Sequence, residues 1–301
     1  MIYLKYFGLK RAPFSLTADP DFFIDFIPHK EALEVITTAL SLGEGVLKIT
    51  GEVGTGKTLL CNKLQGELSK QYLVCAIDNP YLSAQELRST LALHLGIDKK
   101  ALDDQFLLTG LIKDRLLALF TKGKKVLVLM DEAQALPDAS LETLRLFSNL
   151  ETGSDKLLQV VLFGQPELDI RLSEGKLRQL RQRITFSYQL RALSESEIDH
   201  YIHQRLVQAG YRGTVLFNAS VCKEISQASR GIPRLINVLC HKALMISYGR
   251  QHYNITEKLI EEAVMDTEDA YPVQNLNRWW IIFFSFVLIN AVLMVWWKGI
   301  L

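Results

Sequence analysis

One segment, GEVGTGKT at residues 51–58, constrains the fold of this chain more than any other feature. It matches the phosphate-binding pattern G-x-x-x-x-G-K-[ST] and stands between the β-rich run 46–50 and a helical pattern at 57–70. Its glycines allow backbone N–H groups to turn toward phosphates, Lys57 can reach the β- and γ-phosphates, and the Thr58 hydroxyl can bind Mg²⁺. We therefore expect a site for ATP and Mg²⁺ formed by Gly51, Glu52, Val53, Gly54, Thr55, Gly56, Lys57 and Thr58.

Alternating strand and helix patterns around this loop predict a parallel sheet. Apolar runs typical of buried strands follow at 73–78, 125–130, 158–163 and 185–190. Helical patterns separate them at 84–95, 110–120 and 141–150. Such alternation is typical of an α/β fold with helices on both faces of the sheet. We expect a three-layer P-loop domain with a five-stranded parallel sheet over residues 1–193.

After the fifth strand pattern the chain shows only helical patterns. Ser194 and Glu197 fit a capping box at the start of a helix, and Thr256 can cap a later one. We expect a small all-α lid domain over residues 194–266, followed by a linker over residues 267–278.

Residues 279–297 (WWIIFFSFVLINAVLMVWW) form an apolar run without a formal charge, bounded by Arg278 and Lys298. A helix of this length just spans the roughly 30 Å hydrocarbon layer, and tryptophans at both ends suit the two membrane interfaces. A buried core helix is the alternative. The pattern favours a single-pass transmembrane helix in a bacterial inner membrane, with the ATP-binding domain in the cytoplasm.

Two neighbouring acids, Asp131 and Glu132, follow the third strand pattern in VLVLMDEAQ. An aspartate there can hold Mg²⁺ together with Thr58, and the adjacent glutamate can orient and deprotonate the attacking water. Gln165 follows the fourth strand pattern, where its amide could contact the γ-phosphate and water or lie in a surface loop. The sequence thus predicts catalytic residues at the ends of two further strands.

Charge and cysteine spacing exclude some partners and ligands. The net charge is +1, so no overall field attracts nucleic acid. The four cysteines show no zinc-ligand spacing and read as reduced core thiols: Cys61, Cys75, Cys222 and Cys240.

Taken together, GEVGTGKT, LMDEAQ, Gln165, RQRI at residues 181–184 and GIPRLIN at residues 231–237 resemble the AAA+ ATPases of the ExeA (general secretion component A) family. The opening residues, YLKYFGLKRAPF, also resemble the beginning of that family. The similarity spans residues 1–266. Within the family the chain is most similar to short members associated with mannose-sensitive haemagglutinin (type IV) pilus biogenesis.

The resemblance implies roles for these residues and a mode of assembly. Walker A would be residues 51–58, and Walker B would be Asp131 and Glu132. Sensor 1, the arginine finger and sensor 2 would be Gln165, Arg183 and Arg234 in that order. Arg181, two residues from Arg183, is the other candidate for the finger, and each arginine could also be a solvated surface charge. Homo-oligomeric rings or partial rings with nucleotide between subunits are implied as well.

The resemblance and the apolar tail lead to two functional hypotheses. The first is a membrane-anchored ATPase that hydrolyses ATP to support assembly or localisation of an envelope machine, a type IV pilus or a type II secretion system. The alternative is an ATP-dependent DNA-binding regulator of the transposition-ATPase type. The small net charge and the apolar run at residues 279–297 favour the first, so nucleic acid is not an expected partner. Longer relatives continue into a wall-binding domain, which we do not expect in this chain.

Overall fold

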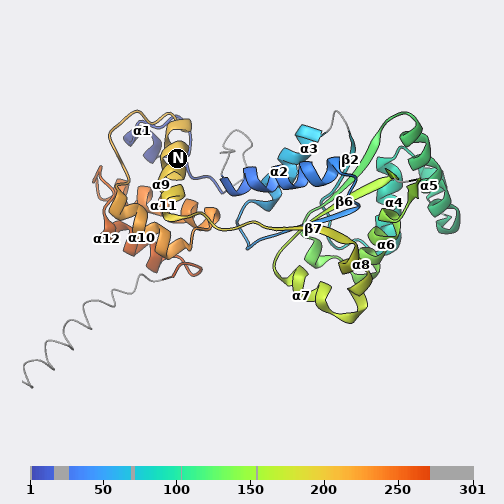
Figure 1. Cartoon of the computed structure of the whole chain (residues 1–301). Coiled ribbons are helices and arrows are strands. Elements are labelled where there is room, and N and C mark those ends of the chain that lie inside the picture. Colours follow the sequence, from blue (N-terminus) through green and yellow to red (C-terminus); the bar gives the residue numbers. More distant parts are fainter. Residues whose placement is uncertain (1, 17–26, 69–71, 103, 154, 272–301) are drawn as a thin grey trace, which may run out of the picture.

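The computed structural model describes residues 2–16, 27–68, 72–102, 104–153 and 155–271, which form an α/β domain and a helical domain (Figure 1). Within these residues no helix is long and apolar enough to cross a membrane. The transmembrane helix expected at residues 279–297 lies outside the described residues, as does most of the expected linker.

The α/β domain is built on a parallel sheet with the strand order β2-β3-β6-β1-β7. The strands are β1 (Val46–Thr50), β2 (Tyr72–Ile77), β3 (Lys125–Met130), β6 (Leu158–Gly164) and β7 (Ile184–Gln189). The predicted five-stranded parallel sheet is therefore confirmed, with strand limits that agree to within one residue. A separate hairpin, β4 (Glu151–Thr152) with β5 (Asp155–Lys156), has no counterpart in the prediction.

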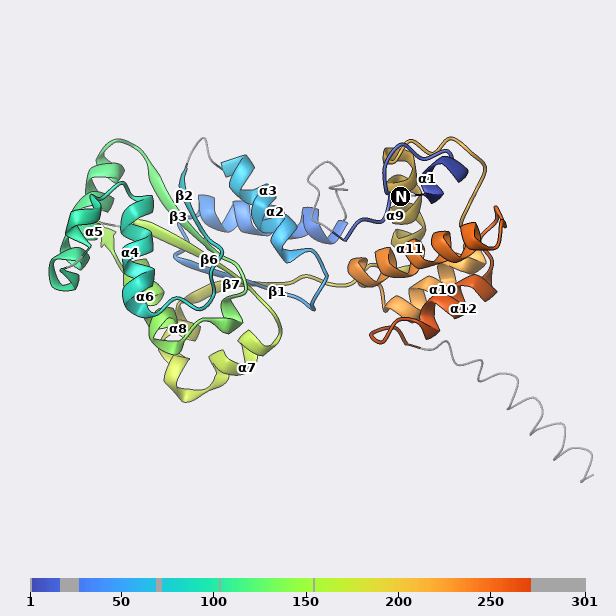
Figure 2. The ribbon, with the colours of Figure 1, turned by 180° about the vertical axis from the view of Figure 1, so that it is seen from behind.

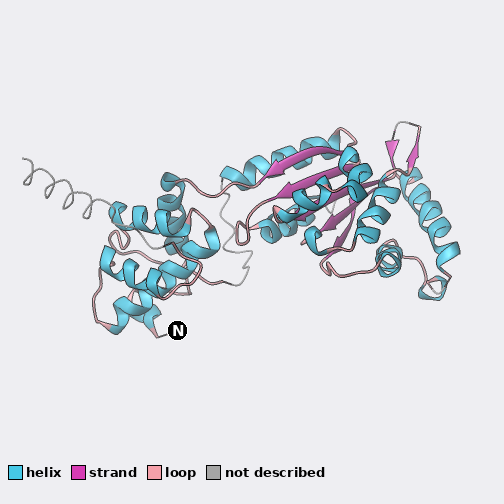
Figure 3. Cartoon of the chain, turned by 90° about the horizontal axis from the view of Figure 1, so that it is seen from below, coloured by secondary structure: helices cyan, strands magenta, loops and turns pink. Residues whose placement is uncertain are grey.

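Helices cover both faces of the sheet and produce three layers, as Figure 3 shows. One face packs on α2 (Ile27–Ser41) and α3 (Lys57–Leu68). The other packs on α4 (Ala84–His94), α5 (Gln105–Thr121), α6 (Asp138–Ser148), α7 (Glu167–Ser173) and α8 (Arg178–Arg183). Short 3₁₀ turns are η2 (Lys99–Ala101), η3 (Ala133–Ala135) and η4 (Gly175–Leu177).

Burial along the strands follows from this layering. Every residue of β6 is buried, because β6 lies at the centre of the sheet with helices on both sides. β7 is an edge strand and alternates half-buried with exposed residues, so that Phe186 and Tyr188 face the helices while Ser187 faces solvent. The sequence pattern of each strand therefore reflects its place in the sheet.

The helical domain contains α9 (Glu195–Gln208), α10 (Ala219–Ser229), α11 (Pro233–Gly249) and α12 (Glu257–Met265). Ser194 and Glu197 form the predicted capping box at α9, with the Ser194 N–H donating to the Glu197 carboxylate at 2.7 Å. Thr256 precedes α12 as expected, but its side chain makes no capping hydrogen bond. The prediction of a side-chain cap at Thr256 is therefore wrong.

The N-terminal residues pack in the helical domain, which differs from the expected grouping of residues 1–193. Tyr3 of α1 (Tyr3–Tyr6), Phe7 and Phe14 share one hydrophobic core with α9 to α12, and Figure 2 shows this end of the chain beside α9. The buried Arg205 of α9 also donates from Nε to the carbonyl of Pro13 at 2.7 Å. Large aromatic side chains need a core to bury them, and this core lies among the last helices of the chain.

Candidate functional site

The loop at residues 51–58 lies at the carboxyl edge of the sheet, where β1 and its neighbour β6 end. Gly51 follows β1, and its N–H donates to the carbonyl of Gly164 at the end of β6. Asp131 follows β3, and Gln165 follows β6. Because all five strands run parallel, the predicted residues from three strands meet at one edge, where ligands of open α/β sheets bind.

Backbone conformation in the loop requires glycine at two positions. Gly54 has φ +84° and Gly56 has φ +95°, in a region that side-chain-bearing residues rarely occupy. The Thr55 hydroxyl closes the loop by donating to the carbonyl of Glu52 at 2.8 Å. Helix α3 then begins at Lys57, so backbone N–H groups at a helix N-terminus face the site, as anion binding needs.

Lys57 is almost fully buried, with 4% of its surface exposed. Its Nζ donates to the carbonyls of Gly51 at 2.8 Å and Glu52 at 3.0 Å. Burial lowers the pKa of Lys57, while the charges of Glu132, Asp131, Glu52 and Glu167 oppose that shift. The lysine is thus held at the loop by neutral carbonyls, and an anion there would stabilise its charged form.

Thr58 and Asp131 are in direct contact. The Thr58 hydroxyl donates to Oδ2 of Asp131 at 2.7 Å, and the N–H of Glu132 donates to Oδ1 at 2.9 Å. Only 8% of Asp131 is exposed, and burial raises the pKa of its carboxyl although both hydrogen bonds lower it. A cation beside this carboxylate would offset the cost of burying it.

This oxygen pair fits Mg²⁺ bound in the usual way at phosphate sites. In the part of the chain that the structure describes, no group of three or more His, Cys, Asp or Glu side chains could hold a metal ion. Mg²⁺ commonly takes one or two protein oxygens and completes its octahedral shell with water and substrate phosphate. A hydroxyl and a carboxylate beside a phosphate-binding loop match that donor set.

Glu132 has left-handed backbone torsions, φ 52° and ψ 39°, which are uncommon outside glycine. Its Oε2 accepts hydrogen bonds from Gln134 Nε2 at 2.5 Å and from Gln165 Nε2 at 3.0 Å. The structure therefore brings Gln165 to Glu132, the two residues expected at the γ-phosphate. The contact with Gln134 was not predicted, although Gln134 stands in the DEAQ sequence.

Two residues outside the loop pack directly against its glycines. A Cβ at Gly54 would lie 2.6 Å from Cβ of Arg234, whose backbone N–H donates to the carbonyl of Gly54 at 3.2 Å. A Cβ at Gly56 would lie 2.6 Å from Nε2 of the buried His29 in α2. Arg234 was predicted to lie near the nucleotide, but His29 was not, because its pattern is that of an ordinary helix residue.

The structure keeps Arg183 away from the loop of its own chain. Arg183 ends α8 and precedes β7, so it lies at the amino edge of the sheet, opposite the phosphate-binding loop. Arg178 and Arg181 are on the same short helix, and all three arginines are exposed. The site within one chain is thus built without these arginines.

Comparison with known proteins agrees with this geometry. Residues 41–172 match the model of an AAA domain. General secretion pathway protein A of Aeromonas hydrophila is 40% identical over 278 residues, which cover 92% of this chain and 49% of that protein. The chain thus spans about half the length of this curated relative.

Solved structures share the fold at low sequence identity. The Aeropyrum pernix ORC2 protein has a TM-score of 0.58 at 19% identity, covering 84% of this chain and 72% of that chain. Cdc6p from Pyrobaculum aerophilum has a TM-score of 0.60 at 15% identity, covering 83% and 71%. These structures show the fold alone. The AAA domain match and the similarity over 92% of the chain identify it as similar to the AAA ATPases of the general secretion pathway protein A kind.

Proposed function

We propose that this chain binds ATP with Mg²⁺ at residues 51–58 and hydrolyses it. The observation that carries the proposal is the hydrogen bond from the Thr58 hydroxyl to Asp131, next to Lys57 in the same loop. Thr58 and Asp131 would hold the ion, which would neutralise charge on the phosphates when bound. Lys57 leaves the carbonyls of Gly51 and Glu52 to reach the β- and γ-phosphates.

Three further residues are proposed to act at the phosphates and the attacking water. Glu132 orients the attacking water and accepts its proton, and Gln165 contacts the γ-phosphate and that water. Both positions are supported by their common hydrogen bond at 3.0 Å. Arg234 contacts the phosphates from the helical domain, which serves as a lid, because its backbone already touches the loop at Gly54.

The chain acts as a homo-oligomer, a ring or partial ring, in which Arg183 reaches the site of a neighbouring subunit. The place of Arg183 at the far edge of the sheet supports this arrangement. An exposed arginine there is free to meet a second subunit. Arg181 is the other candidate, since it is exposed on the same helix.

Hydrolysis is tested with two variants of the full chain in detergent. Lys57→Ala loses ATP binding, whereas Glu132→Gln binds ATP and hydrolyses it very slowly. Binding is measured with a fluorescent ATP analogue, and turnover by phosphate release. Equal turnover in wild type and Glu132→Gln would contradict the roles proposed here.

The cellular role is a second part of the proposal. Residues 279–297 anchor the ATPase on the cytoplasmic side of the inner membrane, where it supports assembly or localisation of a type II secretion system or a type IV pilus of the mannose-sensitive haemagglutinin kind. The relative named a general secretion pathway protein supports the first machine. The composition of residues 279–297 supports the anchor.

Fractionation and copurification test this role. Truncation after Asn277 is expected to abolish carbonate-resistant membrane association, and a truncated chain that stays with the membrane contradicts the anchor. Envelope proteins that copurify with detergent-solubilised Glu132→Gln, and not with Lys57→Ala, are expected to be secretion or pilus components.

A further inference from the structure

Gln134 occupies the centre of a hydrogen-bond network that joins the loops after β3 and β6. Its Nε2 donates to Oε2 of Glu132 at 2.5 Å, and its Oε1 accepts from the backbone N–H of Gln165 at 3.0 Å. Gln165 in turn donates from its own side chain to the same oxygen of Glu132. The three residues therefore form a closed cycle, in which Gln134 and Glu132 each contact both of the other members through the side chain.

We propose that Gln134 is a positioning residue for Glu132, and that it couples this carboxylate to the loop that carries Gln165. The proposal rests on the proposed ATPase function. Within the part of the chain that the structure describes, the side chain of Gln134 makes its hydrogen bonds to Glu132 and Gln165 and none to residues 51–58, so it acts through Glu132.

The orientation of the Gln134 amide is fixed by its partners. A backbone N–H can only donate, so the atom facing Gln165 N must be the amide oxygen. An ionised carboxylate can only accept, so the atom facing Glu132 must be the amide nitrogen. A glutamine satisfies both neighbours at once, whereas a glutamate or an aliphatic side chain in its place cannot.

Close packing holds the network in position. A Cβ at Gly164 would lie 3.4 Å from Oε1 of Gln134 and 2.7 Å from Cδ2 of Leu168 in α7. The absence of a side chain at Gly164 therefore lets the Gln134 amide and the first turn of α7 both approach the end of β6. A shift of the Gln134 amide or of α7 would therefore change the packing of the other at Gly164.

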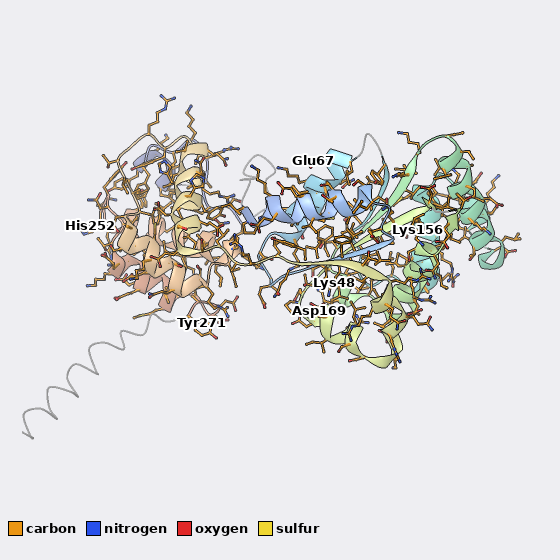
Figure 4. The ribbon with its side chains drawn as sticks, viewed as in Figure 1. Lys48, Glu67, Lys156, Asp169, His252 and Tyr271 are labelled. Carbon is orange, nitrogen blue, oxygen red and sulfur yellow. The ribbon has the colours of Figure 1, made fainter. Side chains whose placement is uncertain are left out.

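The main chain of Gln134 is also tied to α7. Arg171 of α7 donates from Nη1 to the carbonyl of Gln134, and from Nη2 to Asp138 of α6 at 2.5 Å. A second contact, the ion pair between Asp169 of α7 and Lys48 of β1, joins the same helix to the sheet, as Figure 4 shows. The turn that carries Glu132 and Gln134 is thus linked to a helix that begins two residues after Gln165.

This arrangement assigns Gln134 a defined part in turnover. In the structure one carboxylate oxygen of Glu132 accepts from two amides. When Gln165 turns toward the γ-phosphate, Gln134 keeps its hydrogen bond to Glu132 and holds the carboxylate in place for the water. Without Gln134, Glu132, whose left-handed backbone is already strained, has no second amide to fix it.

The test uses Gln134→Met in the full chain, because methionine has a similar volume and cannot make either amide contact. Turnover (kcat) is expected to fall about ten- to a hundredfold, the effect of a lost hydrogen bond to a charged group. The Kd for the fluorescent ATP analogue is expected to stay within about twofold, because binding groups are untouched. Gln227→Met, at an exposed position of α10, is the matched control and is expected to behave as wild type.

A double-mutant cycle with Glu132→Gln separates positioning from a merely structural role. If Gln134 acts through Glu132, adding Gln134→Met to Glu132→Gln lowers the residual turnover by less than about twofold. Additive losses, or loss of ATP binding in Gln134→Met, would show a structural role and overturn the proposal.

A second variant, Gln134→Glu, and comparison of each variant's turnover with that of wild type complete the test. Gln134→Glu keeps the length of the side chain and an acceptor for the Gln165 N–H, but loses the donor to Glu132, so kcat is expected to fall in this variant too. A slow Glu132→Gln with wild-type turnover in Gln134→Glu and Gln134→Met overturns only the role of Gln134. Wild-type turnover in Glu132→Gln overturns the proposed function itself.

Discussion

Replacing Arg183 by alanine and mixing this variant with Lys57→Ala distinguishes action within one subunit from action across a subunit interface. The residue directly precedes β7, whose first and last residues, Ile184 and Gln189, pair with Val46 and Thr50 of β1. Gly51 and the phosphate-binding loop follow Thr50. Five residue steps at about 3.3 Å each separate the two edges by about 17 Å. A single side chain does not cross that distance, so the proposed contact of Arg183 with nucleotide requires the site of another subunit.

The expected loss is large, because a supplied arginine is worth about 10³ to 10⁵ in rate where it has been measured. Arg183→Ala alone should therefore retain a thousandth of wild-type turnover or less, about the same as Lys57→Ala. Its ATP affinity should be nearly unchanged, since its own loop is intact. Arg178→Ala, another exposed arginine of α8, is the matched control and should leave turnover unchanged.

Mixing the two inactive variants gives the decisive result. Arg183→Ala keeps its ATP site, and Lys57→Ala keeps its arginine, so one kind of mixed interface contains both. With random assembly about a quarter of the head-to-tail interfaces are of that kind, and about a quarter of wild-type turnover should return. The variants are coexpressed with different tags, and oligomers carrying both tags are purified before phosphate release is measured.

If turnover does not recover in oligomers that carry both tags, the conclusion that Arg183 acts on the site of another subunit is refuted. The same mixing experiment with Arg181→Ala identifies the finger, because only the variant that lacks it gives complementation. Recovery with Arg181→Ala and wild-type turnover in Arg183→Ala would assign the role to Arg181.

Three further results are expected. Burial raises the pKa of Asp131 above its unfolded value, so the ionised carboxyl destabilises the fold as pH rises through the folded pKa. Asp131→Asn should accordingly raise the melting temperature of the nucleotide-free protein at neutral pH and lose this advantage below a pH of about 4. The same variant should abolish hydrolysis. A melting temperature that is unchanged or lowered at neutral pH would contradict the burial argument. Gly54→Ala should destabilise the protein by about 1–3 kcal/mol from backbone strain alone, and by more from contact with Arg234, as thermal unfolding would measure. Duplex DNA should not be retained with the protein on a filter at moderate salt, with or without ATP, and nucleotide-dependent retention would instead support a DNA-binding regulator.

The sheet and the nucleotide loop could be predicted because their signals are local. The centre of β6 is apolar at nearly every position, so its sequence alone indicates a strand covered on both faces. The loop at residues 51–58 carries its own glycines, lysine and threonine. Neither needs information from distant parts of the chain.

The features that the sequence did not predict depend on contacts between distant segments. The strands β4 and β5 are two residues each and mostly polar, so they show no strand period. The position of α1 is set by a core that forms from the last helices. Gln134 gains its role only when the loop after β6 is placed beside it by the strand order. The residue pattern of one segment does not show which distant segment lies beside it.

The packing of the N-terminal residues has a consequence for how the domains are joined. Residues 2–16 belong to the helical domain and α2 belongs to the α/β domain, so the polypeptide passes between the domains once before the sheet and once after β7. If residues 2–16 were cut from the rest of the chain, the short fragment would remain bound through Tyr3, Phe7 and Phe14. Such a nicked protein would migrate as one species under native conditions and as two only after denaturation.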